Sequence, residues 1–159
     1  MDSAEAITKH VDPNFVAGQS IHRNEFGIKN GIFWSNNGEI VAFYEKDETN
    51  VHDYPLLDIN QTPGSLKSVK YPMAGQNSEY GKVGVYNTKK KTLIYLQPVH
   101  EKDDYVTNLT WCPNDEFIYI AELNRDQNHM KWAQYDVNTG KRIKTIFEEK
   151  NRFGEYNTN

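Results

Sequence analysis

A short polar cluster is the first place in this sequence where chemistry is conceivable. The letters HRNE, residues 22–25, stand just before a segment of alternating apolar and aromatic residues that predicts β-structure. Glu25 lies beside Phe26 and a glycine, a setting suited to holding an ammonium group, because a partly desolvated ion pair is stronger than one in water. The residues alone leave open the alternative of a solvated surface loop.

The sequence lacks the motifs that would support catalysis by this chain itself. It has no G-x-S-x-G turn, which a serine hydrolase of the α/β type needs for its nucleophile. Zinc-ligand spacing and glycine-rich phosphate loops are also missing, so we predict no catalytic residue, no metal site and no cofactor, and a self-sufficient hydrolase is disfavoured. The histidines are scattered along the chain: His10, His22, His52, His100 and His129.

Length, charge and composition narrow the function classes further. With 159 residues, the chain is long enough for one ordinary domain. Its net charge of −4 differs from the basic, clustered footprint of a nucleic-acid-binding protein, so no nucleic-acid partner is expected. Cys112 is the only cysteine, which excludes a disulfide framework within the chain. No apolar run reaches membrane-spanning length, and the first residues lack the pattern of a signal peptide.

Short stretches with period-two alternation dominate the chain and predict an all-β fold. The stretches are EIVAFYEK, KVGVYN, TLIYLQ, EFIYIAEL, KWAQYDV and RIKTIF. Turn sequences such as NNG, PND and NTG separate them. Patterns typical of helices are scarce.

Two segments of the chain match each other and define a repeat. FWSNNGEIVAFYEKD and TWCPNDEFIYIAELN each contain a tryptophan, a small residue, a turn with asparagine, a glutamate and an alternating strand. A hairpin follows each segment, so the repeat predicts a four-stranded antiparallel sheet whose inner strand ends at Trp34 or Trp111. Because a single sheet of this kind cannot bury both faces, we predict that the sheets stack as β-propeller blades. Both tryptophans are expected to pack in the core.

The spacing of the repeat predicts an insertion in its first copy. The tryptophans are 111 − 34 = 77 positions apart, whereas blades take roughly 40–50 residues. Prolines and glycines mark residues 48–82 as an excursion from the sheet. We therefore predict a single propeller fragment, with two blades and part of a third, which is too few to close a ring of about four to eight. Its expected parts are 1–32, the end of one blade and a connection; 33–104, a blade with the insertion; 105–150, the next blade; and 151–159, a tail.

Three stretches carry a resemblance to a known family. They are QSIHRNEFGI with the following GIFWSNNGEIVAFYEKDETNV, then VKYPMAGQNSEYGKVGVYN, then NLTWCPNDEFIYIAELNRDQNHMKWAQYDVNTG. In this order they resemble the N-terminal propeller domain of bacterial dipeptidyl peptidase IV, from the prolyl oligopeptidase group of serine peptidases. The most specific elements are YP-x-AG at 71–75 and NR-x-QN at 124–128. The similarity runs from Ile7 to Glu149.

The resemblance implies a part of an exopeptidase that removes X-Pro or X-Ala dipeptides from free N termini. In that family a C-terminal α/β-hydrolase domain holds the catalytic Ser, Asp and His, and the propeller caps it and restricts access. Acidic propeller residues bind the substrate's α-ammonium. By position, Glu25 is the implied anchor, Asn24 a weaker uncharged partner and Arg125 a candidate substrate contact; mammalian relatives have a second glutamate where this sequence has Asn24.

The same resemblance implies partners and a location. The partners would be peptide substrates with a free N terminus, the hydrolase domain and, in a possible homodimer, a second copy. The location would be the periplasm or the bacterial cell surface. A different class of function stays open: a stand-alone propeller-like module that binds a protein partner through its sheet edges and its inserted loop. A reading frame that continues past Asn159 into a hydrolase domain would distinguish the two.

Overall fold

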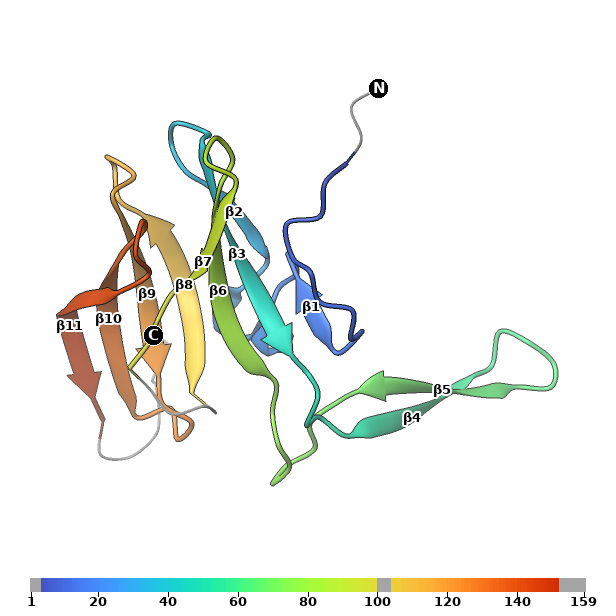
Figure 1. Cartoon of the computed structure of the whole chain (residues 1–159). Helices are drawn as coiled ribbons and strands as arrows, with labels where there is room; N and C mark the ends of the chain where they lie inside the picture. The colour runs from blue at the N-terminus through green and yellow to red at the C-terminus, as the bar shows by residue number, and fades with distance from the viewer. Residues whose placement is uncertain (1–3, 100–103, 152–159) are drawn as a thin grey trace.

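Two antiparallel sheets lie face to face, and a separate hairpin projects from one of them (Figure 1). This computed structural model describes residues 4–99 and 104–151, apart from the side chains at positions 23 and 24. In chain order, the elements are β1 (Phe15–Ala17), the 3-10 helix η1 (His22–Gly27), β2 (Ile32–Trp34), β3 (Ile40–Asp47), β4 (Asp53–Asp58), β5 (Ser65–Lys70), β6 (Tyr80–Asn87), β7 (Thr92–Tyr95), β8 (Tyr105–Trp111), β9 (Phe117–Leu123), β10 (His129–Asp136) and β11 (Arg142–Lys150).

The first sheet has the order β1-β3-β6-β7. The short strand β2 also pairs with β3, alongside β1, on the edge of β3 that does not pair with β6. Both short strands pair antiparallel with β3, β1 with residues 45–47 and β2 with residues 41–43. Between these two ladders, Tyr44 bonds to both sides of the gap. Its carbonyl accepts from the N–H of Gly18 at 2.8 Å, and its own N–H donates to the carbonyl of Gly31 at 2.9 Å. The chain between the two glycines is therefore an excursion out of one inner strand.

The excursion changes how the first residues fit the fold. Residues 1–32 were expected to end a preceding blade, but β1, which belongs to this range, pairs with β3 and helps to complete the first blade. With only three residues, β1 is too short to show an alternation in the sequence.

The second sheet is a simple meander in the order β11-β10-β9-β8. All its pairings are antiparallel, and each joins strands that are neighbours in the chain. Together with the first sheet, this confirms the prediction of an all-β fold built from four-stranded antiparallel blades.

The core lies between the two sheets. Alternate residues of the central strands face it, among them Ala42 and Tyr44 of β3 and Ile118 and Ile120 of β9. Their burial stabilises the stacking because each sheet removes apolar surface of the other from water.

One expectation about the core is wrong. Trp111 packs against the core, and its indole N–H donates to the carbonyl of Phe33 at 3.1 Å. Trp34, however, is 57% exposed. Since side chains alternate along a strand, Phe33 of β2 takes the core-facing position and its neighbour Trp34 faces the other way.

A carboxylate ties the two blades together at one end. Asp115, in the β8–β9 turn, accepts hydrogen bonds from the backbone N–H groups of Asn36 and Asn37 at 2.8 and 2.9 Å, and from the Asn36 amide at 2.7 Å. Desolvation raises the pKa of Asp115, but these hydrogen bonds outweigh it and leave the pKa below its usual value. Turns of different blades are thereby joined.

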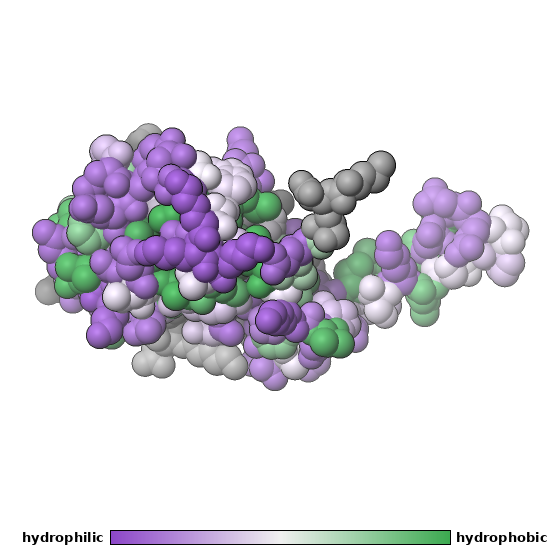
Figure 2. Space-filling view, turned by 45° about the horizontal axis from the view of Figure 1, so that its top comes forward, coloured by the Kyte–Doolittle hydropathy of each residue, from purple (hydrophilic) through white to green (hydrophobic). Residues whose placement is uncertain are grey.

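Within the insertion, β4 and β5 form their own two-stranded sheet. We call this hairpin, Asp53–Lys70, the arm; it projects away from both blades (Figure 1). Figure 2 shows apolar surface on the arm. Its exposed apolar side chains are Tyr54, Leu56, Leu57, Ile59 and Leu66.

Candidate functional site

The excursion carries η1, whose sequence is HRNEFG and which contains Glu25. Although the excursion leaves the first sheet, η1 packs on β8 of the second sheet. The rings of His22 and Phe26 contact the ring of Tyr105, with centroids 5.0 and 5.1 Å apart. Tyr105 itself is buried. The excursion from the first blade is thus held in place by an aromatic residue of the second blade.

His22 at the start of η1 is held by polar contacts on both sides. Its backbone has a φ of +52°, a conformation that non-glycine residues adopt rarely. The carboxylate of Glu79 accepts the His22 backbone N–H. The His22 Nε2 accepts the backbone N–H of Val106 at 3.2 Å. A ring nitrogen that accepts a hydrogen bond carries no proton, so the His22 ring is neutral in this arrangement.

Beside η1 lies a cavity of about 180 Å³ that residues from both blades and from the insertion surround. Its lining residues are His22, Glu25, Tyr71, Pro72, Ser78, Glu79, Tyr105 and Arg125. We call it the inter-blade cavity.

The acidic groups of this cavity differ in how they are engaged. Glu79 is buried, bonded to His22 and 3.9 Å from the ammonium of Lys46. Glu25 is exposed, and no hydrogen bond or ion pair within the described residues engages its carboxylate. Glu25 is therefore the carboxylate that a cationic group entering the cavity can pair with.

Arg125 reaches the cavity from the tight turn between β9 and β10. The amide oxygen of Asn124 accepts backbone N–H groups of Asn128 and His129 at 3.0 and 2.9 Å, which fixes the turn. The Arg125 guanidinium donates to the Tyr105 hydroxyl at 2.6 Å and lies 5.3 Å from the centre of that ring. In the part of the chain that the structure describes, this guanidinium forms no ion pair.

The structure places the sequence-predicted site residues as follows. Glu25 and Arg125, 100 positions apart in the chain, line the same cavity. The backbone of Asn24 lies in η1, but its side chain is outside the described residues. Sequence reasoning missed Tyr71, although the YP-x-AG element that contains it supported the family resemblance. It also missed Glu79, because nothing local shows that position 79 meets the backbone of η1.

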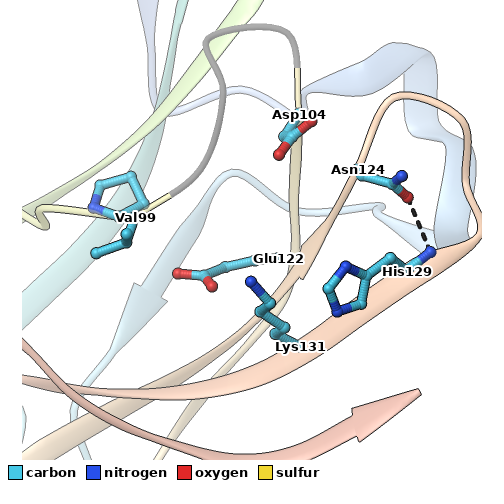
Figure 3. A pocket seen from close by; sticks show the side chains of 7 residues that line it. Val99, Asp104, Glu122, Asn124, His129 and Lys131 are labelled. Atoms are coloured by element: carbon cyan, nitrogen blue, oxygen red, sulfur yellow. Dashed lines mark hydrogen bonds between the residues drawn. The ribbon is translucent and has the colours of Figure 1, made fainter. Parts of the chain in front are cut away.

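A second cavity lies on the second blade and is lined by Pro98, Val99, Asp104, Glu122, Asn124, His129 and Lys131 (Figure 3). Its central carboxylate is already engaged: Glu122 accepts from the Tyr135 hydroxyl and pairs with Arg142 at 3.1 Å. His129 pairs with Glu148. These contacts give the cavity a structural role in the blade, and we do not assign a ligand to it.

The described residues contain no group of three or more His, Cys, Asp or Glu side chains placed to hold a metal ion. Among the same residues, no helix is long and apolar enough to cross a membrane.

Comparison with known proteins gives a consistent result. A family model described as the dipeptidyl peptidase IV (DPP IV) N-terminal region matches residues 1–158. A crystal structure of a dipeptidyl aminopeptidase IV from Bacteroides ovatus is 44% identical over 93% of this chain, with a TM-score of 0.87. The dipeptidyl peptidase 4 of Porphyromonas gingivalis has the same fold, with a TM-score of 0.82 at 23% identity over 92% of the chain. A dipeptidyl-aminopeptidase B of Tuber melanosporum is 24% identical over 91% of the chain.

The matched part of these relatives is small. The chain covers 21% of each of the two solved structures and 18% of the Tuber protein. The likeness therefore concerns one region of much longer proteins.

Proposed function

Since the chain belongs to the family of dipeptidyl peptidase IV N-terminal regions, we propose that it is the non-catalytic propeller part of a serine exopeptidase that removes X-Pro or X-Ala dipeptides. The chemistry would be supplied by a C-terminal α/β-hydrolase domain, which this propeller part caps and to which it gates access. The stand-alone interaction module considered from the sequence is not favoured by these comparisons.

In this proposal, Glu25 anchors the α-ammonium of the substrate. Its carboxylate has no partner within the described residues and lines a cavity that blades and insertion enclose together. An ammonium paired with Glu25 fixes how far the peptide enters, so the scissile bond falls after the second residue. This is catalysis by positioning. Asn24, next to it in η1, is the uncharged second acceptor.

The observation that carries the proposal is the way η1 is held. His22 is fixed through Glu79 and Val106, and its ring and that of Phe26 pack on Tyr105, so Glu25 between them is presented by a rigid segment. A solvated loop, the alternative that the sequence left open, has no need of such contacts across two blades.

The test is Glu25→Gln in the intact protein that contains these residues. We expect kcat/KM for an Ala-Pro anilide with a free amine to fall about 10- to 100-fold, since hydrogen bonds to charged groups contribute roughly 1.5–3 kcal/mol. The variant should lose its discrimination against the N-acetylated substrate, because that discrimination comes from the ammonium. Steady-state kinetics with both substrates measure this.

The matched control is Glu149→Gln, which removes the same charge from an exposed position on β11. It should leave kcat/KM unchanged. Equal kinetics of Glu25→Gln and the control, with both proteins folded by circular dichroism, would remove Glu25 from the proposed role.

We also propose two properties of the assembled enzyme. The first is a homodimer in which the arm contributes to the contact between copies; it projects from the blades and exposes Leu57 and Leu66, which are 65% and 75% accessible and pair across the hairpin. The second is export to the periplasm or the cell surface, which fractionation of producing cells tests.

A further inference from the structure

We propose that Arg125 gives the enzyme a preference for substrates whose first residue is acidic: its guanidinium binds the side-chain carboxylate while Glu25 binds the α-ammonium of the same residue. This inference rests on the proposed function and specifies the substrate class of that same cavity.

The first support is the pair of opposite charges. Glu25 and Arg125 line one cavity, and within the described residues neither group forms an ion pair. Arginine has five N–H donors in a planar fork that matches a carboxylate, and only one donation from the guanidinium of Arg125, to Tyr105, occurs among the described residues. Donors remain for an anionic ligand.

The second support is that Arg125 is ordered before a ligand arrives. Its backbone N–H donates to the Asp104 carboxylate at 3.1 Å, and its guanidinium lies against the ring of Tyr105. The turn that carries it is closed by Asn124. A side chain held in this way loses less conformational freedom on binding than a free arginine does.

The third support is the charge of the remaining cavity wall. The His22 ring is neutral because its Nε2 accepts a hydrogen bond. Glu79 is buried and engaged with the backbone of His22 and with Lys46. Among the described lining residues, one available anion and one available cation therefore remain, which complements an ammonium and a carboxylate on one ligand residue. A basic first residue would bring a second cation toward Arg125.

The size of the cavity agrees with a ligand of this kind. About 180 Å³ is below the roughly 300–1,000 Å³ of sites for drug-sized molecules. The cavity therefore suits the end of a chain, a single residue with its amino group, rather than an extended peptide.

The experiment compares Glu-Pro, Gln-Pro and Lys-Pro anilides in the intact protein, since glutamate and glutamine differ in charge at equal size. We expect kcat/KM for Glu-Pro to exceed that for Gln-Pro by about tenfold, the scale of a charge-assisted hydrogen bond, and Lys-Pro to be the poorest substrate. Arg125→Gln should abolish the Glu over Gln preference, so that the ratio of kcat/KM for Glu-Pro to that for Gln-Pro falls from about ten to about one. The control Lys90→Gln, a charge removed from the exposed β6–β7 turn, should retain the preference.

Two results would overturn the inference: equal cleavage of Glu-Pro and Gln-Pro by the wild type, or an equal loss for all three substrates in Arg125→Gln. The proposed function fails separately, if Glu25→Gln leaves Gln-Pro cleavage intact. If no anilide is turned over, calorimetric binding of the Glu-Pro and Gln-Pro dipeptides to wild type and Arg125→Gln makes the same comparison, and equal affinities reject the inference.

Discussion

At the scale of single residues, Tyr44 combines two tasks. Its backbone bonds to Gly18 and Gly31 on either side of the excursion, and its hydroxyl accepts the backbone N–H of Leu109 at 3.3 Å. The ladder between β8 and β9 shifts register between Thr107 and Thr110, so this N–H has no ladder partner there. The Tyr44 hydroxyl supplies one, and burial raises the pKa of Tyr44 to about 12.

Tyr44→Phe should therefore lower the free energy of unfolding by about 1–3 kcal/mol, the cost of leaving a buried N–H without an acceptor. Urea denaturation measures the loss. The control Tyr54→Phe, on the arm, should change it little, and a Tyr44→Phe chain as stable as the wild type would contradict the assignment.

Tyr44 is also expected to make the free energy of unfolding depend on pH. The pKa of Tyr44 is raised from 10.0 to about 12 on folding, so the folded state keeps a proton that the unfolded state releases. The contribution is fully present below pH 10 and is lost as pH rises toward 12. Tyr44→Phe should flatten part of the alkaline decrease in stability. Burial also raises the pKa of Tyr95 and Tyr135, so the remaining decrease persists.

At the scale of elements, the excursion (residues 19–30) depends on the close approach of its two ends at Gln19 and Gly31, which we call the neck. A Cβ on Gly31 would lie 2.3 Å from the backbone carbonyl of Gln19. The two ends of the excursion approach this closely because they leave and re-enter one strand position beside Tyr44. Only a glycine leaves room for the second backbone.

Gly31→Ala should destabilise the chain by at least about 1–3 kcal/mol, because the clash is with backbone and cannot be relieved by a side-chain rotation. In the intact protein, discrimination between free and acetylated substrate amines should also weaken, since η1 shifts with the neck. Thermal denaturation and kinetics measure the two effects. Asn30→Ala, at the exposed preceding residue, is the control; equal behaviour of the two variants would show that the neck is not tight.

The elements also show what sequence reasoning can reach. Alternating apolar residues after Trp34 and Trp111 predicted the four-stranded blades, because period-two patterning is local. The split inner strand was not predictable, since β1 and β2 have three residues each and are joined only through β3. Likewise, Glu25 was predicted from its position in the family resemblance, while Glu79 and Tyr105, which line the same cavity, come from distant positions that only the fold brings together.

At the scale of the whole molecule, the arm and the blades have different surroundings. The blades bury their apolar residues between the sheets, whereas the arm leaves Leu57 and Leu66 accessible on a two-stranded sheet. An isolated hairpin is marginally stable in water, and exposed apolar surface of this kind marks an interaction site. In the proposed homodimer, the arm is the part of the molecule that the second copy would stabilise.

Replacing both Leu57 and Leu66 by glutamate should convert a dimer into monomers while the blades stay folded, because the like charges face each other across the hairpin and desolvate poorly. Analytical ultracentrifugation of the intact protein measures the mass, and circular dichroism the fold. The double change Ser65→Glu and Ser68→Glu, at exposed polar positions of β5, adds the same charge and is the control. A wild type that is monomeric at every concentration rejects the dimer.

The residues that line the inter-blade cavity are synthesised at different times. Glu25 is translated 125 − 25 = 100 residues before Arg125, an interval of about 5–20 s at roughly 5–20 residues per second. For the first 105 − 25 = 80 residues of that interval, the nascent chain contains η1 without Tyr105, on which it packs. The η1 segment that carries Glu25 is therefore made well before Tyr105 and Arg125, the second-blade residues that complete the cavity around it.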